Sequence, residues 1–188
     1  LATTLATAYL SQGHRDNAKT AADAALTAVP GYPRALTVRA QLLAIDRDLD
    51  GALKALNEAL AAAPNLADAT LLKAQILIAQ DKRDEAIKLL ADAATAADGA
   101  PLSMQLRSAL VPLLIASGDV ARAEGEVAAM KKAAPKDLRT SFAEAQVAIA
   151  KRDFAKARDA AQVVLAARPD NLPALYLSGL AQYGLGSW

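Results

Sequence analysis

The sequence contains no cysteine, a single histidine and only 4% aromatic residues. The lack of cysteine excludes disulfides, thiolate metal sites and thiol nucleophiles from this chain, but it leaves the compartment open. No apolar run approaches the roughly 20 residues that a membrane span needs. The first four residues, Leu1-Ala2-Thr3-Thr4, lack the basic start of a signal peptide. With 21 basic and 20 acidic residues, the chain has no long-range field that would attract nucleic acid or an anionic membrane.

What the sequence has is apolar content, at 54% of its 188 residues, most of it alanine and leucine. This length and composition indicate a folded domain with a core rather than a disordered chain. Alanine and leucine favour helices that pack at close range, whereas sheets favour β-branched and aromatic residues. We therefore predict an all-α protein.

Prolines recur with a period of 34, 37, 34 and 34 residues, at Pro30, Pro64, Pro101, Pro135 and Pro169. A period of about 34 residues is typical of repeats built from two helices. If each proline is position 32 and closes its repeat, small residues should fall at positions 8, 20 and 27, where two helices approach.

Small residues do fall at these positions. Position 8 is occupied by Ala6, Ala40, Ala74, Val111, Ala145 and Gly179, so that we expect Gly179 to be a packing glycine. Position 20 is alanine in five repeats, at Ala18, Ala52, Ala86, Ala123 and Ala157. Position 27 reads Ala25, Ala59, Ala93, Met130 and Val164, which predicts looser packing in repeats four and five. Position 15, where a left-handed residue ends the first helix, reads Gly13, Arg47, Asp81, Gly118, Arg152 and Gly186.

These columns resemble the tetratricopeptide repeat family over the whole chain. The resemblance implies a right-handed superhelical solenoid of antiparallel helix hairpins, with about five and a half repeats. The predicted boundaries are residues 1–32, 33–66, 67–103, 104–137 and 138–171, followed by the first helix of a sixth repeat at 172–188. Because it begins and ends inside a repeat, we interpret the chain as a piece of a longer protein.

Two departures from the pattern fall near the middle. Three extra residues precede Pro101, which predicts that the second helix of repeat three continues until it breaks at Gly99. Pro112 lies inside the first helix of repeat four, where we expect a kink because proline removes one backbone hydrogen bond.

No residue pattern argues for catalysis, a metal or a cofactor. His14 has no partner that would make a nucleophile–base pair. Asp46, Asp48 and Asp50 lack the glycine and the glutamate that a calcium loop requires, and a helix-connecting turn explains them better. The basic run from Lys131 to Arg139 has no interleaved aromatic residues, so it is interpreted as a solvated helix end rather than a nucleic-acid site.

In a tetratricopeptide solenoid the first helix of each hairpin lines a concave groove, with positions 2, 5, 9 and 12 facing into it. The predicted groove residues are Arg34, Thr37, Gln41, Leu71, Gln75, Ile78, Arg139, Phe142, Gln146 and Tyr176. The three glutamines at position 9 have the donors and acceptors to bind a peptide backbone, but glutamine is also a good helix former on any wet surface. Both interpretations stay open. Arg34 and Arg139 would meet a carboxylate, and the mixture suits an extended segment or an amphipathic helix of a partner protein.

Chaperone-binding members of the family clamp a terminal carboxylate with lysine at position 5 and asparagine at position 9. Here those positions hold threonine, leucine and glutamine in the first three repeats, which disfavours a chaperone clamp.

A narrower resemblance lies in residues 130–188, in the segments 130–136, 152–158, 174–179 and 184–187, together with residues 30–36. These segments are similar to the tetratricopeptide lipoproteins of bacterial exosortase (PEP-CTERM) systems, which are encoded beside exopolysaccharide synthesis and export genes. The resemblance implies a periplasmic scaffold, anchored in the inner or outer membrane through a lipidated cysteine upstream of this chain. A cytoplasmic location is the alternative.

Three hypotheses for function follow. The first is a noncatalytic scaffold that binds protein or peptide segments in its groove and organises an envelope assembly for exopolysaccharide or sorted proteins. The second is a structural spacer that self-associates through its apolar last helix. The third is a regulatory region of a larger enzyme. None of the three involves nucleic acid or direct membrane contact by this segment.

Overall fold

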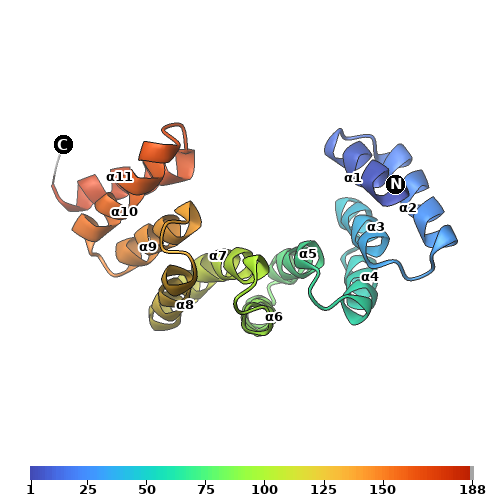
Figure 1. Ribbon diagram of the computed structural model, residues 1–188, viewed down its shortest axis with the longest axis horizontal. Helices are drawn as coiled ribbons and strands as arrows, with labels where there is room; N and C mark the ends of the chain where they lie inside the picture. The colour runs from blue at the N-terminus through green and yellow to red at the C-terminus, as the bar shows by residue number, and fades with distance from the viewer. Residues whose placement is uncertain (187–188) are drawn as a thin grey trace. The chain divides into compact units, whose positions relative to one another are not determined.

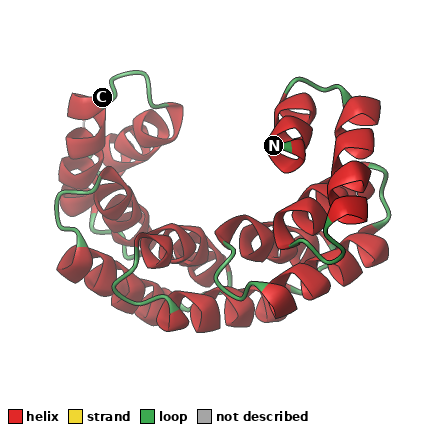
Figure 2. Ribbon diagram, turned by 45° about the vertical axis from the view of Figure 1, so that its right-hand side comes forward, coloured by secondary structure: helices red, strands yellow, loops and turns green. Residues whose placement is uncertain are grey.

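The computed structural model describes residues 1–186, which fold into helices joined by short loops, with no strand in that range (Figures 1 and 2). The chain divides into two compact units, Leu1–Leu89 and the part from Leu90 onward. The division falls within the helix that spans Arg83–Ala96. The all-α prediction is confirmed.

Antiparallel hairpins build both units (Figure 1). In the first unit the helices are α1 (Ala2–Ser11), α2 (Arg15–Ala28), α3 (Pro33–Ile45), α4 (Leu49–Ala62) and α5 (Ala67–Ala79). Helix α6 (Arg83–Ala96) spans the division. In the second unit they are α7 (Pro101–Ala116), α8 (Val120–Ala133), α9 (Leu138–Ala150), α10 (Phe154–Ala167) and α11 (Leu172–Gly184).

The turn inside each hairpin has one left-handed residue, at the position that the repeat predicts. The backbone angle φ is 78° at Gly13 and 83° at Gly118. It is also positive at the three residues that replace glycine, with φ of 66° at Arg47, 62° at Asp81 and 61° at Arg152. A left-handed conformation strains any residue with a Cβ atom. The repeat geometry is therefore held even where the sequence does not favour it.

Aspartates begin several of the second helices of the hairpins. The Asp48 carboxylate accepts a hydrogen bond of 2.9 Å from the backbone N–H of Gly51, and Asp119 and Asp153 do the same for α8 and α10. Such a cap satisfies an N–H group that has no partner within its helix. The interpretation of Asp48 as part of a helix-connecting turn is confirmed.

The small-residue columns form the contacts inside the hairpins. All five alanines at position 20 are 0% exposed, and the position-8 residues from Ala6 to Ala145 are at most 2% exposed. Alanine lets two helices approach closely because its side chain ends at Cβ. At position 27 the larger Met130 and Val164 are also buried, whereas in repeat three the buried alanine is Ala94 and not the predicted Ala93.

The three extra residues lie elsewhere than predicted. Helix α6 ends at Ala96 and has 14 residues, like α2, α4, α8 and α10, so the predicted extension to Gly99 is wrong. Instead α7 has 16 residues and begins at Pro101, whereas α3, α5, α9 and α11 have 13. Pro101 is thus the first residue of a helix and not the end of a repeat. The fixed φ of proline and its missing N–H suit that position.

Two further expectations concern single residues within helices. Helix α7 runs through the exposed Pro112 without interruption. The prediction for Gly179 stays a prediction, because position 8 packs against the second helix of its own repeat and the sequence contains only the first helix of repeat six. A close approach is made by Gly184, where an added Cβ atom would clash with the Phe154 ring. The last helix is therefore packed at its end through a contact that the repeat pattern did not predict.

Candidate functional site

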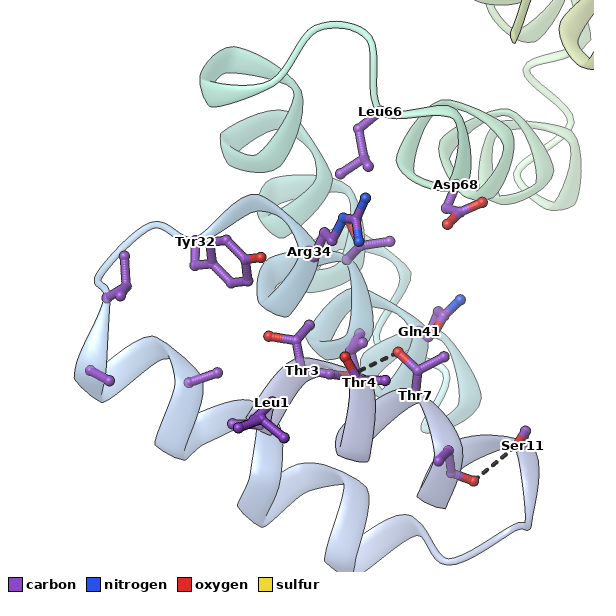
Figure 3. A pocket seen from close by; sticks show the side chains of 17 residues that line it. Leu1, Thr3, Thr4, Thr7, Ser11, Tyr32, Arg34, Gln41, Leu66 and Asp68 are labelled. Atoms are coloured by element: carbon purple, nitrogen blue, oxygen red, sulfur yellow. Dashed lines mark hydrogen bonds between the residues drawn. The ribbon is translucent and has the colours of Figure 1, made fainter. Parts of the chain in front are cut away.

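The first unit contains a cavity of about 750 Å³ on the face formed by the first helices of its hairpins. Helices α1 and α3, the end of α2, the beginning of α5 and the links before α3 and α5 supply its walls (Figure 3). The side chains that line it include Leu1, Thr3, Thr4, Thr7, Ser11, Tyr32, Arg34, Thr37, Gln41, Leu66 and Asp68. The cavity therefore combines hydroxyl, amide and charged groups with apolar ones.

Three of the predicted groove residues meet in this cavity, namely Arg34, Thr37 and Gln41. The hydroxyl of Thr37 is not available to a ligand, because the side chain is 5% exposed and donates a 2.9 Å hydrogen bond to the Pro33 carbonyl oxygen. Arg34 is exposed and Gln41 is half-buried. Within residues 1–186, neither of these two side chains makes a hydrogen bond or an ion pair with the protein.

Repeat one supplies hydroxyl groups at the positions equivalent to Thr37 and Gln41. These are Thr3 and Thr7, and the Thr7 hydroxyl donates to the Thr3 carbonyl oxygen at 3.0 Å. Helical threonines commonly bond backward in this way, and the oxygen keeps acceptor capacity. Thr7 is exposed at the cavity surface.

Besides the hydroxyl residues of repeat one, the predicted groove set omitted Tyr32 and Asp68, which contribute polar groups to the cavity. Asp68 is the second residue of α5, as Arg34 is of α3, and within the described chain its carboxylate also has no partner. The repeat register was a sufficient signal for Asp68, since it stands at position 2 of repeat three. Tyr32 precedes α3 in a link, and no helical periodicity marks a link residue.

The remaining predicted residues lie outside this cavity. In the first unit, Leu71 and Ile78 are half-buried on α5, and Gln75 is exposed. In the second unit, Phe142 packs against the buried cluster that contains Ala145, Ala160 and Leu177, and Gln146 is half-buried. Tyr176 on α11 is 67% exposed.

Arg139 occupies the same repeat position as Arg34, but its guanidinium is already paired. It donates to both carboxylate oxygens of Asp137, over 3.0 and 2.6 Å. These hydrogen bonds lower the pKa of Asp137 and raise the pKa of Arg139. The carboxylate that the sequence assigned to a partner of Arg139 is thus supplied by the protein itself.

A second guanidinium, Arg107, connects three parts of the second unit. It forms ion pairs with Glu126 on α8 and, over 3.3 Å, with Asp98 in the link before α7. Its Nε donates to the Ser103 hydroxyl at 3.0 Å, and that hydroxyl donates to the Ala94 carbonyl oxygen at 3.1 Å. Ser103 is one of the three extra residues at the start of α7. The added turn is therefore held by a polar network.

A third group of charges joins α8, α9 and α10. Glu144 accepts a hydrogen bond from Lys131 at 3.1 Å and forms an ion pair with Lys156 at 3.3 Å, and Glu124 accepts a hydrogen bond from Lys151 at 2.7 Å. Burial alone would raise the pKa of Glu144, but the two lysines outweigh burial and leave this pKa below its ordinary value. The hydrogen bond from Lys151 lowers the pKa of Glu124. These contacts connect neighbouring repeats, and four of these side chains line a small cavity of about 50 Å³, namely Glu124, Glu144, Lys151 and Lys156.

Two other kinds of site are absent from residues 1–186. No three histidine, aspartate or glutamate side chains gather there in a way that would hold a metal ion. None of the helices in that range has the length and apolar character needed to span a bilayer.

Comparison with known proteins places these hairpins in a family. A sequence profile described as tetratricopeptide repeat matches residues 3–67 and 142–188, and a second profile with the same description matches residues 43–104. A search of curated protein sequences returned no match.

Solved structures share the fold at low sequence identity. PilF of Pseudomonas aeruginosa has a TM-score of 0.78 at 18% identity, over 99% of this chain and 83% of that one. PilW, described as a type IV pilus biogenesis factor, has a TM-score of 0.78 at 19% identity, over 99% and 85% of the two chains. YrrB, described as a tetratricopeptide protein with an unusual peptide-binding site, has a TM-score of 0.63 at 17% identity, over 95% and 90%.

Proteins with this architecture are generally noncatalytic scaffolds, because stacked hairpins create extended binding surfaces. The profile matches cover more than half of the sequence and agree with the hairpin geometry of both units. The chain belongs to the tetratricopeptide repeat family.

Proposed function

We propose that this protein is a noncatalytic scaffold that binds an extended segment of a partner protein in the cavity of its first unit. The observation that carries the proposal is the set of side chains without intramolecular partners around that cavity. Arg34, Gln41 and Asp68 converge there from α3 and α5 (Figure 3). Together they offer donors and acceptors that match the polar groups of a polypeptide.

The size of the cavity supports this proposal. Its volume of about 750 Å³ lies within the range of about 300–1,000 Å³ that is usual for ligand pockets. Apolar side chains such as Leu1, Val29 and Leu66 stand beside the polar ones, so a bound segment can bury an apolar side chain next to its hydrogen bonds. The peptide-binding site of YrrB is a precedent for a peptide ligand on this fold.

A matched pair of threonines provides the test. Thr7 lines the cavity and Thr20 on α2 does not, yet both are exposed and both donate to the carbonyl oxygen four residues earlier. Tryptophan in place of Thr7 would occupy the cavity, whereas tryptophan in place of Thr20 would add the same bulk outside it. We expect Thr7→Trp to abolish capture of partners by chemical crosslinking in cells and Thr20→Trp to leave it intact.

The two variants also separate the outcomes. If Thr7→Trp and Thr20→Trp retain the same crosslinked partners as the unsubstituted protein, binding does not use this cavity and the proposal is wrong. Circular dichroism of both variants would verify that the helices are retained.

The finer proposal concerns the biological assembly. The resemblance of residues 130–188 to exosortase-associated lipoproteins supports a role in organising a bacterial envelope assembly for exopolysaccharide or protein sorting. The same resemblance supports a periplasmic location with a membrane anchor. Fractionation of cells that express the complete reading frame tests this location, and recovery in the cytoplasm would contradict it.

Self-association is a second candidate function, favoured by the last helix. The exposed apolar side chains of α11 and of the residue directly after it are Leu172, Leu175, Tyr176, Tyr183 and Leu185. Exposed apolar side chains that form a contiguous patch often mark a contact between proteins. Light scattering over a concentration series would reveal association, and Tyr176→Asp should abolish it. A monomer at every concentration would exclude this function for the chain.

A further inference from the structure

The guanidinium of Arg34 lines the cavity without an ion pair to any described residue. It is the second residue of α3, in a helix whose first turn contains no acidic residue. Backbone N–H groups at a helix N-terminus give that end a partial positive charge, so a cation there is unfavourable without a counter-charge. Within residues 1–186 no carboxylate bonds to Arg34.

The equivalent residue in repeat five shows how the protein treats such a cation elsewhere. Arg139 is also the second residue of its helix, and Asp137 two residues earlier holds it through hydrogen bonds of 3.0 and 2.6 Å. The residue two before Arg34 is Tyr32, which has no carboxylate. The first unit therefore presents the same cation without a carboxylate bonded to it.

Asp68 limits what can supply that counter-ion. It lines the same cavity as Arg34, and Figure 3 shows both side chains beside Leu66. Asp68 stands in the first turn of α5, where the partial positive charge of the helix end stabilises a carboxylate. It therefore needs no cation, and it repels further negative charge near Arg34.

We propose that the ligand of this cavity is a protein segment with a single carboxylate, flanked by neutral or apolar residues, which binds Arg34 as Asp137 binds Arg139. The inference rests on the proposed function and adds the chemistry of the partner. A planar guanidinium and a carboxylate form two parallel hydrogen bonds, which fixes orientation as well as adding affinity. A run of acidic residues is rejected by Asp68.

The probe is a displayed library of random linear peptides of about ten residues, which span about 33 Å when extended. Selection on the intact chain should enrich peptides that have one aspartate or glutamate between neutral residues. Replacing that acid with its amide in a selected peptide should weaken binding about tenfold or more, as expected for a charge-assisted pair.

Protein variants locate the effect. Arg34→Met should weaken binding of the acidic peptide by a similar factor and leave its amide analogue unaffected. Arg139→Met is the matched control and should change neither affinity, because Asp137 already occupies that guanidinium. Asp68→Asn should extend binding to peptides with several consecutive acids.

The outcomes separate this inference from the proposed function. If peptides bind, if Thr7→Trp blocks them and if Arg34→Met leaves their affinity unchanged, the cavity is a binding site and the carboxylate inference is overturned. If no selected peptide is blocked by Thr7→Trp, the proposed function fails and the inference fails with it. Equal loss with Arg34→Met and Arg139→Met would also overturn the inference, because the effect would not belong to the cavity.

Discussion

The two units contain nearly the same number of charged residues but differ in how many of them form ion pairs within the fold. Residues 1–89 contain ten basic and ten acidic residues, and residues 90–188 contain eleven and ten. Among residues 1–186, every ion pair joins two side chains of the second unit. Composition therefore says little about which charges are available to a partner.

The cause of this difference is local. Asp137 precedes Arg139, whereas Tyr32 precedes Arg34, so only one of two equivalent arginines finds a carboxylate within reach. In the second unit, Lys131 and Lys156 reach Glu144 from both neighbouring helices. Charges that are paired within the fold stabilise contacts between repeats. Unpaired charges around a cavity remain available to bind a ligand.

The largest expected effect tests what the two units have in common. Ala52→Trp in the first unit and Ala157→Trp in the second should each lower the free energy of unfolding by about 3 kcal/mol, because both alanines are fully buried between helices. Denaturant unfolding followed by circular dichroism would measure this. Lys54→Trp, at an exposed position, is the control. An unchanged midpoint in both alanine variants would mean that position 20 is not a packing position.

The next largest effect is a loss of stability that should differ between the two units. Arg107→Met removes a side chain that is 12% exposed and strands Glu126, whose side chain is 20% exposed, so we expect a loss of about 2 kcal/mol. Arg39→Met in the first unit removes an exposed, unpaired cation and should change stability by less than about 0.5 kcal/mol. The double variant Arg107→Met with Glu126→Leu should recover much of the loss. Equal effects at Arg107 and Arg39 would show that the network is not structural.

Alanine substitutions at two glycines of the second unit should change stability in opposite directions. Gly118→Ala forces a Cβ atom into a backbone with φ of 83° and should cost about 1 kcal/mol. Gly125→Ala adds a Cβ in open space within α8 and should stabilise the protein by about 0.5 kcal/mol. Gly13→Ala should match Gly118→Ala, because the hairpin turn is common to both units. Melting temperatures measure all three, and a stabilising Gly118→Ala would contradict the turn geometry.

The smallest expected effect is a loss of stability at acid pH. The pKa of Glu144 is lowered in the folded state, so its contribution to stability is complete above the ordinary glutamate pKa of about 4.3 and is lost as the pH falls through the lower folded value. Asp137, whose pKa is also lowered, acts in the same direction. Hydrogen exchange should therefore show α8, α9 and α10 opening more readily below about pH 4.3.

A glutamine substitution tests whether these ion pairs are the cause. Glu144→Gln should make the stability of α8, α9 and α10 less dependent on pH in the acid range. The first unit, which has no ion pair among its side chains, should respond less than the second. An acid response equal in the two units would contradict the comparison.

Much of the fold could be predicted from the sequence because small residues recur at fixed positions of the repeat. The alanines at position 20 and the left-handed turn residues follow the 34-residue register, and the structure confirms both columns. The repeat register gave a wrong prediction where one residue type suits two structural positions. Pro101 matched the spacing of a closing proline, but proline is equally suited to the first turn of a helix, and here it begins α7.

The candidate site was predictable only in part. Arg34 and Gln41 follow from helical positions that face one side, and Asp68 shares the register of Arg34. Tyr32 lies in a link, where no period applies. The pairing of Arg139 was not foreseen, because a pattern of residue types does not show which neighbour a long side chain contacts.

The sequence by itself determined the all-helical hairpins, their turns and their packing columns, because each depends on residues close together in the chain. Only the tertiary structure decided which charges are paired, where the three extra residues of α7 lie and which side chains share a cavity. These features depend on distances between helices, since a hydrogen bond or an ion pair forms only when two groups meet within a few ångströms. That requirement separates Arg34 from Arg139, which the repeat pattern treats as the same residue.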